Sequence, residues 1–302
     1  MAEKDITEKI LEAYNDVFAD IVNVLLFNGR DVIKPDELVE QAPRTAYKAD
    51  GKIREIERDV AKRWLKQNIR IACVGFENQT AVDPDMPIRV IGYDGAEYRS
   101  ELANDKKDEN GKIIRAERYP VVTLVLYFGY KKHWDKPTNL LGCFNVPEEF
   151  KPYVNDYKMH LFEIAYLSDE QVKLFHSDFR VVADYFVQMR KNRDYVPDPV
   201  KIKHVQETLE LLSVMTGDHR YEDSANDAEK GEPENMCEVL DRIETKGRTE
   251  GRAEGINTGK ILGFIEACRD DGLSDDATQE KIMRRFHLTP NVAKEYLALK
   301  TV

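Results

Sequence analysis

The sequence predicts an α/β fold, in which a mixed central sheet is flanked by helices and followed by an α-helical C-terminal region. Three observations lead to this prediction. Apolar residues recur at helical spacing between Asp5 and Gly29. Two strand-like apolar segments follow at 69–76 and Tyr119–Tyr130, and the second lacks polar alternation, which is typical of a strand covered on both faces. After Ser168 the apolar spacing becomes helical again.

The composition indicates a folded protein outside the membrane. The chain has 302 residues, of which 42% are hydrophobic and 33% charged, so it can bury a sizeable core. The longest apolar run, Val121–Phe128, is too short to span a bilayer, and no signal-like segment opens the sequence. Four widely separated cysteines without a Cys-x-x-Cys pair favour neither a disulfide framework nor a zinc cluster. We therefore expect a cytoplasmic protein with reduced thiols and no membrane partner.

The order of the predicted elements divides the chain into four parts. A capping box at Ser168-Asp169-Glu170-Gln171 opens the helical extension, and Gly217-Asp218 marks its end. A polar stretch with almost nothing to bury follows, and we predict a linker there. The predicted parts are a core over residues 1–167, a helical extension that packs on it over 168–217, a flexible linker over 218–235, and a helical tail over 236–302.

Within the core, the pattern of apolar residues and turn signals predicts the successive elements. The turn-like Lys66-Gln67-Asn68 separates two extended segments and so indicates a hairpin. Prolines at 84 and 87 indicate a break before the next helix. The predicted elements are a loop with room for a short helix at 30–52, extended segments at 53–64 and 69–76, a helix at Tyr93–Leu102, a polar loop at Asp105–Lys112, and strands at Tyr119–Tyr130 and Met159–Leu167.

The tail carries the only internal periodicity, since Gly247, Gly251, Gly255, Gly259 and Gly263 fall every four residues. Each Gly costs about 1 kcal/mol relative to Ala in a helix, so the five together cost roughly 5 kcal/mol. A close helix partner would offset this cost, and we predict a homo-oligomer formed through the tail. A partly frayed helical linker is the alternative. Two short helices, beginning near Ser274 and Thr289-Pro290, should end the chain as a packed hairpin.

One set of side chains in the predicted hairpin suits metal chemistry. Phosphodiester hydrolysis by a divalent metal needs carboxylates that converge on one cation. Asp59 lies in the first extended segment and Glu77 ends the second, and their separation of 77 − 59 = 18 residues suits two strands joined by a turn. Gln79 stands two residues later on the same strand face. Glu55 and Glu57 share the face of Asp59 and remain alternative ligands.

These residues resemble a known signature. Glu57-Arg58-Asp59-Val60, followed by Gly75-Phe76-Glu77-Asn78-Gln79-Thr80, is similar to the two halves of the PD-(D/E)XK nuclease motif, in the Glu-x-Gln form of the recombination-promoting nuclease and putative transposase family. The segment Tyr14-Asn15-Asp16-Val17-Phe18-Ala19-Asp20 also resembles the first-helix motif of that family. The resemblance implies a restriction-endonuclease-like core.

The resemblance also implies a site and an activity. Asp59, Glu77 and the backbone carbonyl of Asn78 would bind Mg²⁺, or Mn²⁺ or Ca²⁺ in its place, and Asp16 or Asp20 would add an acidic group. Gln79 would occupy the place of the usual lysine, and Arg58 stands where proline is usual. The expected activity is Mg²⁺-dependent DNA cleavage linked to recombination or mobile elements.

The basic residues that could contact nucleic acid must act locally, because the net charge is −11. Lys62 and Arg63 stand beside the predicted site, and Lys131 and Lys132 follow the central strand. Solvated surface charge is the alternative role for each of them. A catalytically inactive interaction protein that keeps the nuclease fold is the alternative function.

Overall fold

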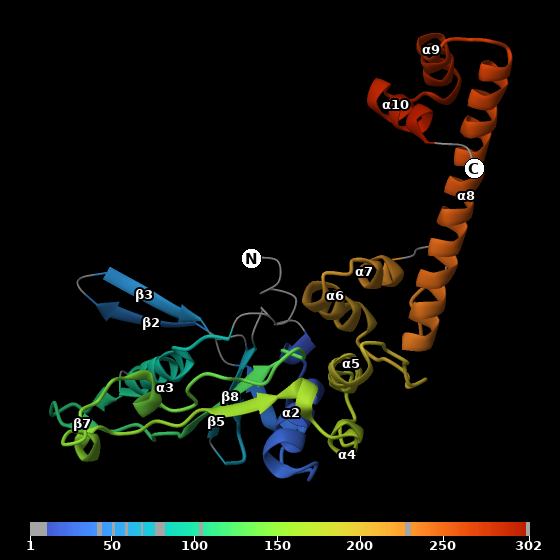
Figure 1. The fold of residues 1–302 in the computed structure, drawn as a ribbon. Helices are drawn as coiled ribbons and strands as arrows, with labels where there is room; N and C mark the ends of the chain where they lie inside the picture. The colour runs from blue at the N-terminus through green and yellow to red at the C-terminus, as the bar shows by residue number, and fades with distance from the viewer. Residues whose placement is uncertain are drawn as a thin grey trace. The chain divides into compact units, whose positions relative to one another are not determined.

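The computed structural model describes residues 11–40, 44–49, 52–57, 60–67, 69–75, 82–102, 105–226 and 231–299. The chain divides into two compact units, Met1–Val239 and Leu240–Val302. The first unit contains a mixed sheet with helices around it, and the second is helical (Figure 1). The predicted mixed α/β architecture with a helical C-terminal region is therefore confirmed.

A sheet of five strands forms the centre of the first unit, in the spatial order β1-β4-β5-β8-β9. β1 pairs with β4 and β4 with β5 in antiparallel fashion, whereas β5, β8 and β9 run parallel. The hairpin predicted around Lys66-Gln67-Asn68 is present as β4 and β5, with turn residues at 65–67, and the apolar strand β8 is internal, as its sequence indicated. The strands are β1 (Leu38–Glu40), β4 (Val60–Trp64), β5 (Ile69–Gly75), β8 (Val121–Tyr127) and β9 (His160–Glu163).

The strand register defines one edge of this sheet, which we call the carboxyl edge. Val60, the first residue of β4, pairs with Cys73 near the end of β5. Gly75 at the end of β5 pairs with Leu126 of β8, and the last residues of β8 and β9, Tyr127 and Glu163, pair with each other. The start of β4 and the ends of β5, β8 and β9 therefore meet at this edge.

Helix α2 (Asn15–Phe27) buries its apolar side chains, among them Val17, Phe18 and Ile21. It ends at Asn28, which adopts the left-handed conformation with φ 55° and is followed by Gly29 at φ 77°. The helical spacing predicted to extend to Gly29 therefore ends at this point in the structure as well.

Helix α3 (Met86–Leu102) begins seven residues before the predicted start at Tyr93, because Pro87 lies in its first turn, where proline costs no hydrogen bond.

The helical extension consists of three helices. The capping box at Ser168 is present, but α4 (Asp169–Lys173) is short, and α5 (Phe179–Asn192) begins after a break at 174–178. α6 (Val205–Thr216) ends at Gly217 with φ 74°, as predicted. Figure 1 shows α2, α4 and α5 close to one another beside the sheet.

The segment 218–235 differs from the predicted flexible linker. Residues 220–225 form helix α7 (Arg220–Ala225), in which Tyr221 is buried and its ring contacts the ring of Tyr185. Ile202 donates its backbone N–H to the carbonyl of Glu234 at 2.9 Å. The ring of Tyr221 and the backbone of Glu234 thus attach the described parts of this segment to the first unit.

Short elements occupy the remaining parts of the first unit, including the start of the extended segment predicted at 53–64 and the end of the strand predicted at Met159–Leu167. They are the 3-10 helices η1 (Pro35–Glu37), η2 (Leu140–Cys143), η3 (Lys151–Tyr153) and η4 (Ile164–Tyr166), the hairpin of β2 (Arg44–Ala49) and β3 (Lys52–Glu57), and the hairpin of β6 (Lys106–Lys107) and β7 (Ile113–Ile114).

The second unit contains most of the long helix α8 (Met236–Asp270), followed by α9 (Asp275–Phe286) and α10 (Pro290–Ala298). The two short terminal helices begin where the sequence predicted, and Ser274 caps α9 by accepting the N–H of Ala277. Ile261 and Ile265 of α8 pack with Ile282 and Ala293 in a small core. None of the described helices has the length and apolar character needed to cross a bilayer.

The first unit depends on Asn23, a buried polar residue of α2. Its amide nitrogen donates to the carbonyl of Ile33 at 2.8 Å, and its amide oxygen accepts the N–H groups of Val32 and Ile33. We expect Asn23→Ala to lower the free energy of unfolding by roughly 3 kcal/mol, because these buried groups lose their partners. Urea unfolding followed by circular dichroism measures this change. The exposed Asn192 is the control, and an equal effect of Asn192→Ala would contradict the explanation.

Candidate functional site

The loop after β8 brings basic side chains to the carboxyl edge. Lys131 and Lys132 are exposed, and the carbonyl of Lys132 accepts a hydrogen bond from the Tyr127 hydroxyl at 3.2 Å. Gly129 makes this turn possible, since a Cβ atom there would overlap the ring of Tyr127. The chain therefore curls back over the buried Tyr127 and presents the two lysines at the surface.

Glu163, the last residue of β9, contacts the next part of the same loop, at His133 and Trp134. Its carboxylate accepts the backbone N–H of Trp134 at 2.7 Å and lies 3.2 Å from Nδ1 of His133. The His133 ring stacks on Tyr166, with ring centroids 3.6 Å apart. The Arg190 guanidinium lies 5.0 Å from the centroid of the Tyr166 ring. Burial, and secondly the charge of Glu163, raise the pKa of Tyr166, so this hydroxyl stays neutral at physiological pH.

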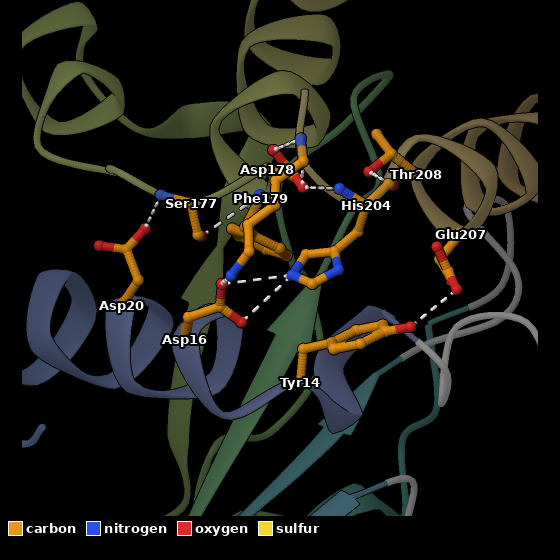
Figure 2. A network of polar contacts seen from close by, with 10 residues as sticks. Tyr14, Asp16, Asp20, Ser177, Asp178, Phe179, His204, Glu207 and Thr208 are labelled. Carbon is orange, nitrogen blue, oxygen red and sulfur yellow. Dashed lines mark hydrogen bonds and ion pairs between the residues drawn. The ribbon is translucent and has the colours of Figure 1, made fainter. Parts of the chain in front are cut away.

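A second polar cluster connects the start of α2 with the start of α6 (Figure 2). Asp16 accepts a hydrogen bond from the Lys203 ammonium group at 2.5 Å and lies 3.2 Å from Nε2 of His204. The His204 ring stacks on Tyr14 with a centroid distance of 3.7 Å, and the Tyr14 hydroxyl donates to Glu207 at 2.8 Å. The hydrogen bond to Glu207 raises the pKa of Tyr14.

Two further carboxylates of this cluster bind backbone N–H groups. Asp20 accepts the N–H groups of His176 and Ser177 at 2.8 and 2.7 Å, which explains why the chain breaks between α4 and α5 (Figure 2). Asp178 accepts the backbone N–H groups of Lys203 and His204. An open cavity of about 370 Å³ lies between these groups, lined by both acidic and basic side chains.

The structure describes only some of the predicted site residues. Asp59, Glu77, Asn78 and Gln79 lie outside the described residues. Asp16 and Asp20 lie on α2, and their carboxylates bind protein groups from residues 176–204. Among the described residues, no group of three or more His, Cys, Asp or Glu side chains is arranged to hold a metal ion.

Of the four residues predicted to contact nucleic acid, two pack within the protein and two are exposed. Lys62 is only 1% exposed, and its ammonium group donates to the carbonyl of Ala13 at 2.5 Å. Its position on the sheet interior leaves it no contact with a surface ligand, which corrects the prediction for this residue. Burial lowers the pKa of Lys62, and the nearby Glu40 partly offsets the effect. Arg63 packs over the Tyr119 ring at 4.4 Å. Lys131 and Lys132, in contrast, are exposed at the carboxyl edge.

The sequence did not predict which residues pair with each other in the cluster around Asp16 or in the cluster around Glu163. Asp16 and His204 are separated by 188 residues, and His133 and Glu163 by 30, so no local spacing connects them. One signal was available for Glu163. A carboxylate at the end of a parallel strand lies where open α/β sheets usually bind ligands.

The contact of Asp16 with Lys203 and His204 predicts a pH dependence of stability. Burial acts to raise the pKa of Asp16, but the hydrogen bonds from Lys203 and His204 outweigh it, so the pKa lies below its usual 3.8. Because the folded-state pKa is lowered, the stabilisation is complete well above pH 3.8 and is lost as the pH falls through the folded-state pKa. We expect Asp16→Asn to cost about 1 kcal/mol at neutral pH, allowing for its partial exposure, and progressively less in acid. Urea unfolding of both proteins between neutral and acid pH measures the difference, and a pH-independent difference would contradict it.

Comparison with known proteins finds a similarity to a protein family over part of the chain. Residues 67–213 match the family model described as putative transposase, YhgA-like. The matched segment includes β5, β8, β9 and helices α3 to α5, and thus the whole loop with Lys131, Lys132 and His133. No curated protein and no solved structure was found to match the chain. Over residues 67–213, slightly less than half of the 302-residue chain, the protein is similar to the family of YhgA-like putative transposases.

Proposed function

We propose that the protein is a Mg²⁺-dependent DNA endonuclease whose site lies at the carboxyl edge. One observation carries the proposal: the register of β4 and β5 brings the start of one strand beside the end of the other. Asp59 directly precedes β4, and Glu77 follows the last residue of β5 by two positions. Consecutive Cα atoms are about 3.8 Å apart, so each of these residues is joined to the edge by a short tether.

The order of elements supports the same proposal. Helix α2 is followed by β1, β4 and β5 as three antiparallel strands, then by α3 and the parallel strand β8. A first helix, a hairpin and an internal strand in this order are compatible with the PD-(D/E)XK resemblance. A restriction-endonuclease-like core is thus part of the proposal.

The donor atoms at this edge fit a hard divalent cation. Asp59 and Glu77 offer carboxylate oxygens and Asn78 a backbone carbonyl, which are the ligands that Mg²⁺ or Mn²⁺ prefers. When bound, Mg²⁺ would supply the positive charge that lowers the pKa of water and stabilises the phosphate in the transition state. Gln79 would position water or phosphate by hydrogen bonding, since an amide carries no charge.

The same edge offers the local positive charge that DNA binding requires. Lys131 and Lys132 are exposed on the loop that follows β8, next to the end of β5 in the sheet. Such a patch can contact phosphates although the whole chain has a net charge of −11. The family description, putative transposase, supports a role in recombination or in mobile elements.

Plasmid cleavage tests the proposal most simply. We expect the native chain to nick supercoiled plasmid in the presence of Mg²⁺, and Asp59→Ala or Glu77→Ala to slow cleavage by a factor on the order of 100 to 1000, because several kcal/mol of charge stabilisation are lost. Glu109→Ala, which removes an exposed carboxylate from the turn between β6 and β7, is the control and should cleave normally.

The opposite result would favour the alternative function. If the native chain neither cleaves plasmid nor binds Mg²⁺ in calorimetry, the protein is an interaction protein that keeps the nuclease fold. If Glu109→Ala lost as much activity as Asp59→Ala and Glu77→Ala, the loss in all three variants would reflect damage to the fold and not the removal of a metal ligand.

We also propose that two copies associate through α8. Its five glycines, from Gly247 to Gly263, have no neighbouring atom within 4 Å of an added Cβ, and all residues of 244–257 are exposed. Residues spaced by four form a ridge on a helix, and a ridge made of glycine lets two helix backbones approach closely. This would offset the low helix propensity of the segment.

The charges beside the glycines favour a parallel pair. Arg248 and Arg252 follow glycines and lie along one side of the stripe, whereas Glu250 and Glu254 precede glycines and lie along the other. When two identical helices face each other in parallel, opposite sides meet, so arginines face glutamates. In an antiparallel pair, like charges would meet.

Sedimentation velocity of the full chain tests this pairing. We expect the native chain to self-associate, and the double change Glu250→Arg with Glu254→Arg to weaken association by about tenfold or more, because like charges then face each other. Adding Arg248→Glu and Arg252→Glu should restore it, since the two sides are complementary again. A monomeric native chain, or no effect of the double change, would contradict the proposal.

A further inference from the structure

We propose that His133 is a stacking platform for an unpaired base of the DNA substrate, which makes single-stranded or locally unpaired DNA the preferred substrate class. The inference rests on the proposed function, because it assumes that DNA binds at the carboxyl edge. It adds the strandedness of the substrate and a residue that selects it.

The ring of His133 is held in a fixed orientation. Its Nδ1 lies 3.2 Å from both carboxylate oxygens of Glu163, and one of its faces stacks on Tyr166 at 3.6 Å. Tyr166 itself belongs to η4, where Arg190 contacts its ring and also donates Nε–H to the carbonyl of Ala165 at 2.6 Å. Because these contacts fix the ring in advance, binding a base there costs little side-chain entropy.

The other face of the ring is open. His133 is 67% exposed although Tyr166 covers one side, so the remaining face is accessible to solvent. The neighbouring aromatic residues are less available, since Tyr127 is buried and Trp134 packs edge-on against it. Every base has a flat π-face, and stacking on an aromatic side chain contributes about 1–3 kcal/mol per base without regard to sequence.

The surroundings favour nucleic acid over other flat ligands. Lys131 and Lys132 precede His133 on the same exposed loop, where the Lys132 ammonium group lies 3.3 Å from a carboxylate oxygen of Asp135. Basic side chains together with an aromatic ring are the usual combination in sites that bind single strands. Inside a duplex, stacking of neighbouring base pairs covers the faces of the bases, so the ring can stack only on a base that is unpaired or extruded.

The platform lies close to the proposed cleavage site. His133 binds Glu163 at the end of β9, and β9 is two positions from β5 in the sheet. Neighbouring strands are about 4.8 Å apart, so the two strand ends are separated by roughly 10 Å, about three nucleotide rises along one DNA strand. A base stacked on His133 would thus lie within a few nucleotides of the cleaved phosphate.

Binding measured without Mg²⁺ separates this inference from cleavage. The probes are a fluorescently labelled single-stranded oligodeoxynucleotide and the duplex of the same sequence, titrated with the full chain and followed by anisotropy. We expect His133→Ala to weaken single-strand binding about tenfold and duplex binding less than twofold, as the loss of one stacked base predicts. His133→Phe should keep native affinity for the single strand, because it restores the aromatic face without the imidazole.

His219→Ala is the matched control, since His219 is 81% exposed and also lies near a carboxylate, that of Glu222. The inference is overturned if His133→Ala binds the single strand as the native chain does, or if it weakens single strand and duplex equally, which would indicate a purely electrostatic contact. If His133→Ala weakens single-strand binding while Asp59→Ala and Glu77→Ala leave plasmid cleavage unchanged, the stacking role of His133 is supported and the proposed catalytic site is contradicted.

Discussion

The pairing of β8 with β5 on one side and β9 on the other is the constraint on which the candidate site depends. Its register fixes Gly75 beside Leu126 and Tyr127 beside Glu163, so the ends of three parallel strands coincide. Burial of β8 on both faces explains this register, because a shift by one residue would exchange the side chains between the two faces of the sheet. The polar loop with Lys131, Lys132 and His133 can therefore begin only at this edge.

The two polar clusters make different contributions. Around α2, the carboxylates of Asp16, Asp20 and Asp178 bind backbone N–H groups and cationic side chains, and thereby join the first helix to the helical extension. These groups are satisfied by protein partners, which indicates a structural role. At the carboxyl edge, Lys131 and the open face of His133 point to solvent, which indicates a role in binding.

The sequence allowed much of the fold to be predicted, because periodicity and turn signals are local. The hairpin of β4 and β5, the internal strand β8, the capping box at Ser168 and the helix end at Gly217 are confirmed. Predictions failed where a distant contact decided the structure. Asp20 ends one helix and permits the next, and the burial of Tyr221 converts a polar stretch into α7. The buried position of Lys62 likewise depends on Ala13, which is 49 residues away. For the site, Lys131 and Lys132 could be named from the sequence, whereas the pairing of His133 with Glu163 requires the register of β8 and β9.

The metal site proposed at the carboxyl edge can be located in a crystal of the full chain soaked in Mn²⁺, because anomalous scattering reveals the ion. We expect one strong peak bonded to the carboxylates of Asp59 and Glu77, beside the ends of β5 and β8. A peak held instead by Asp16 or Asp20 on α2, or no peak at the carboxyl edge at saturating Mn²⁺, would contradict the proposed site.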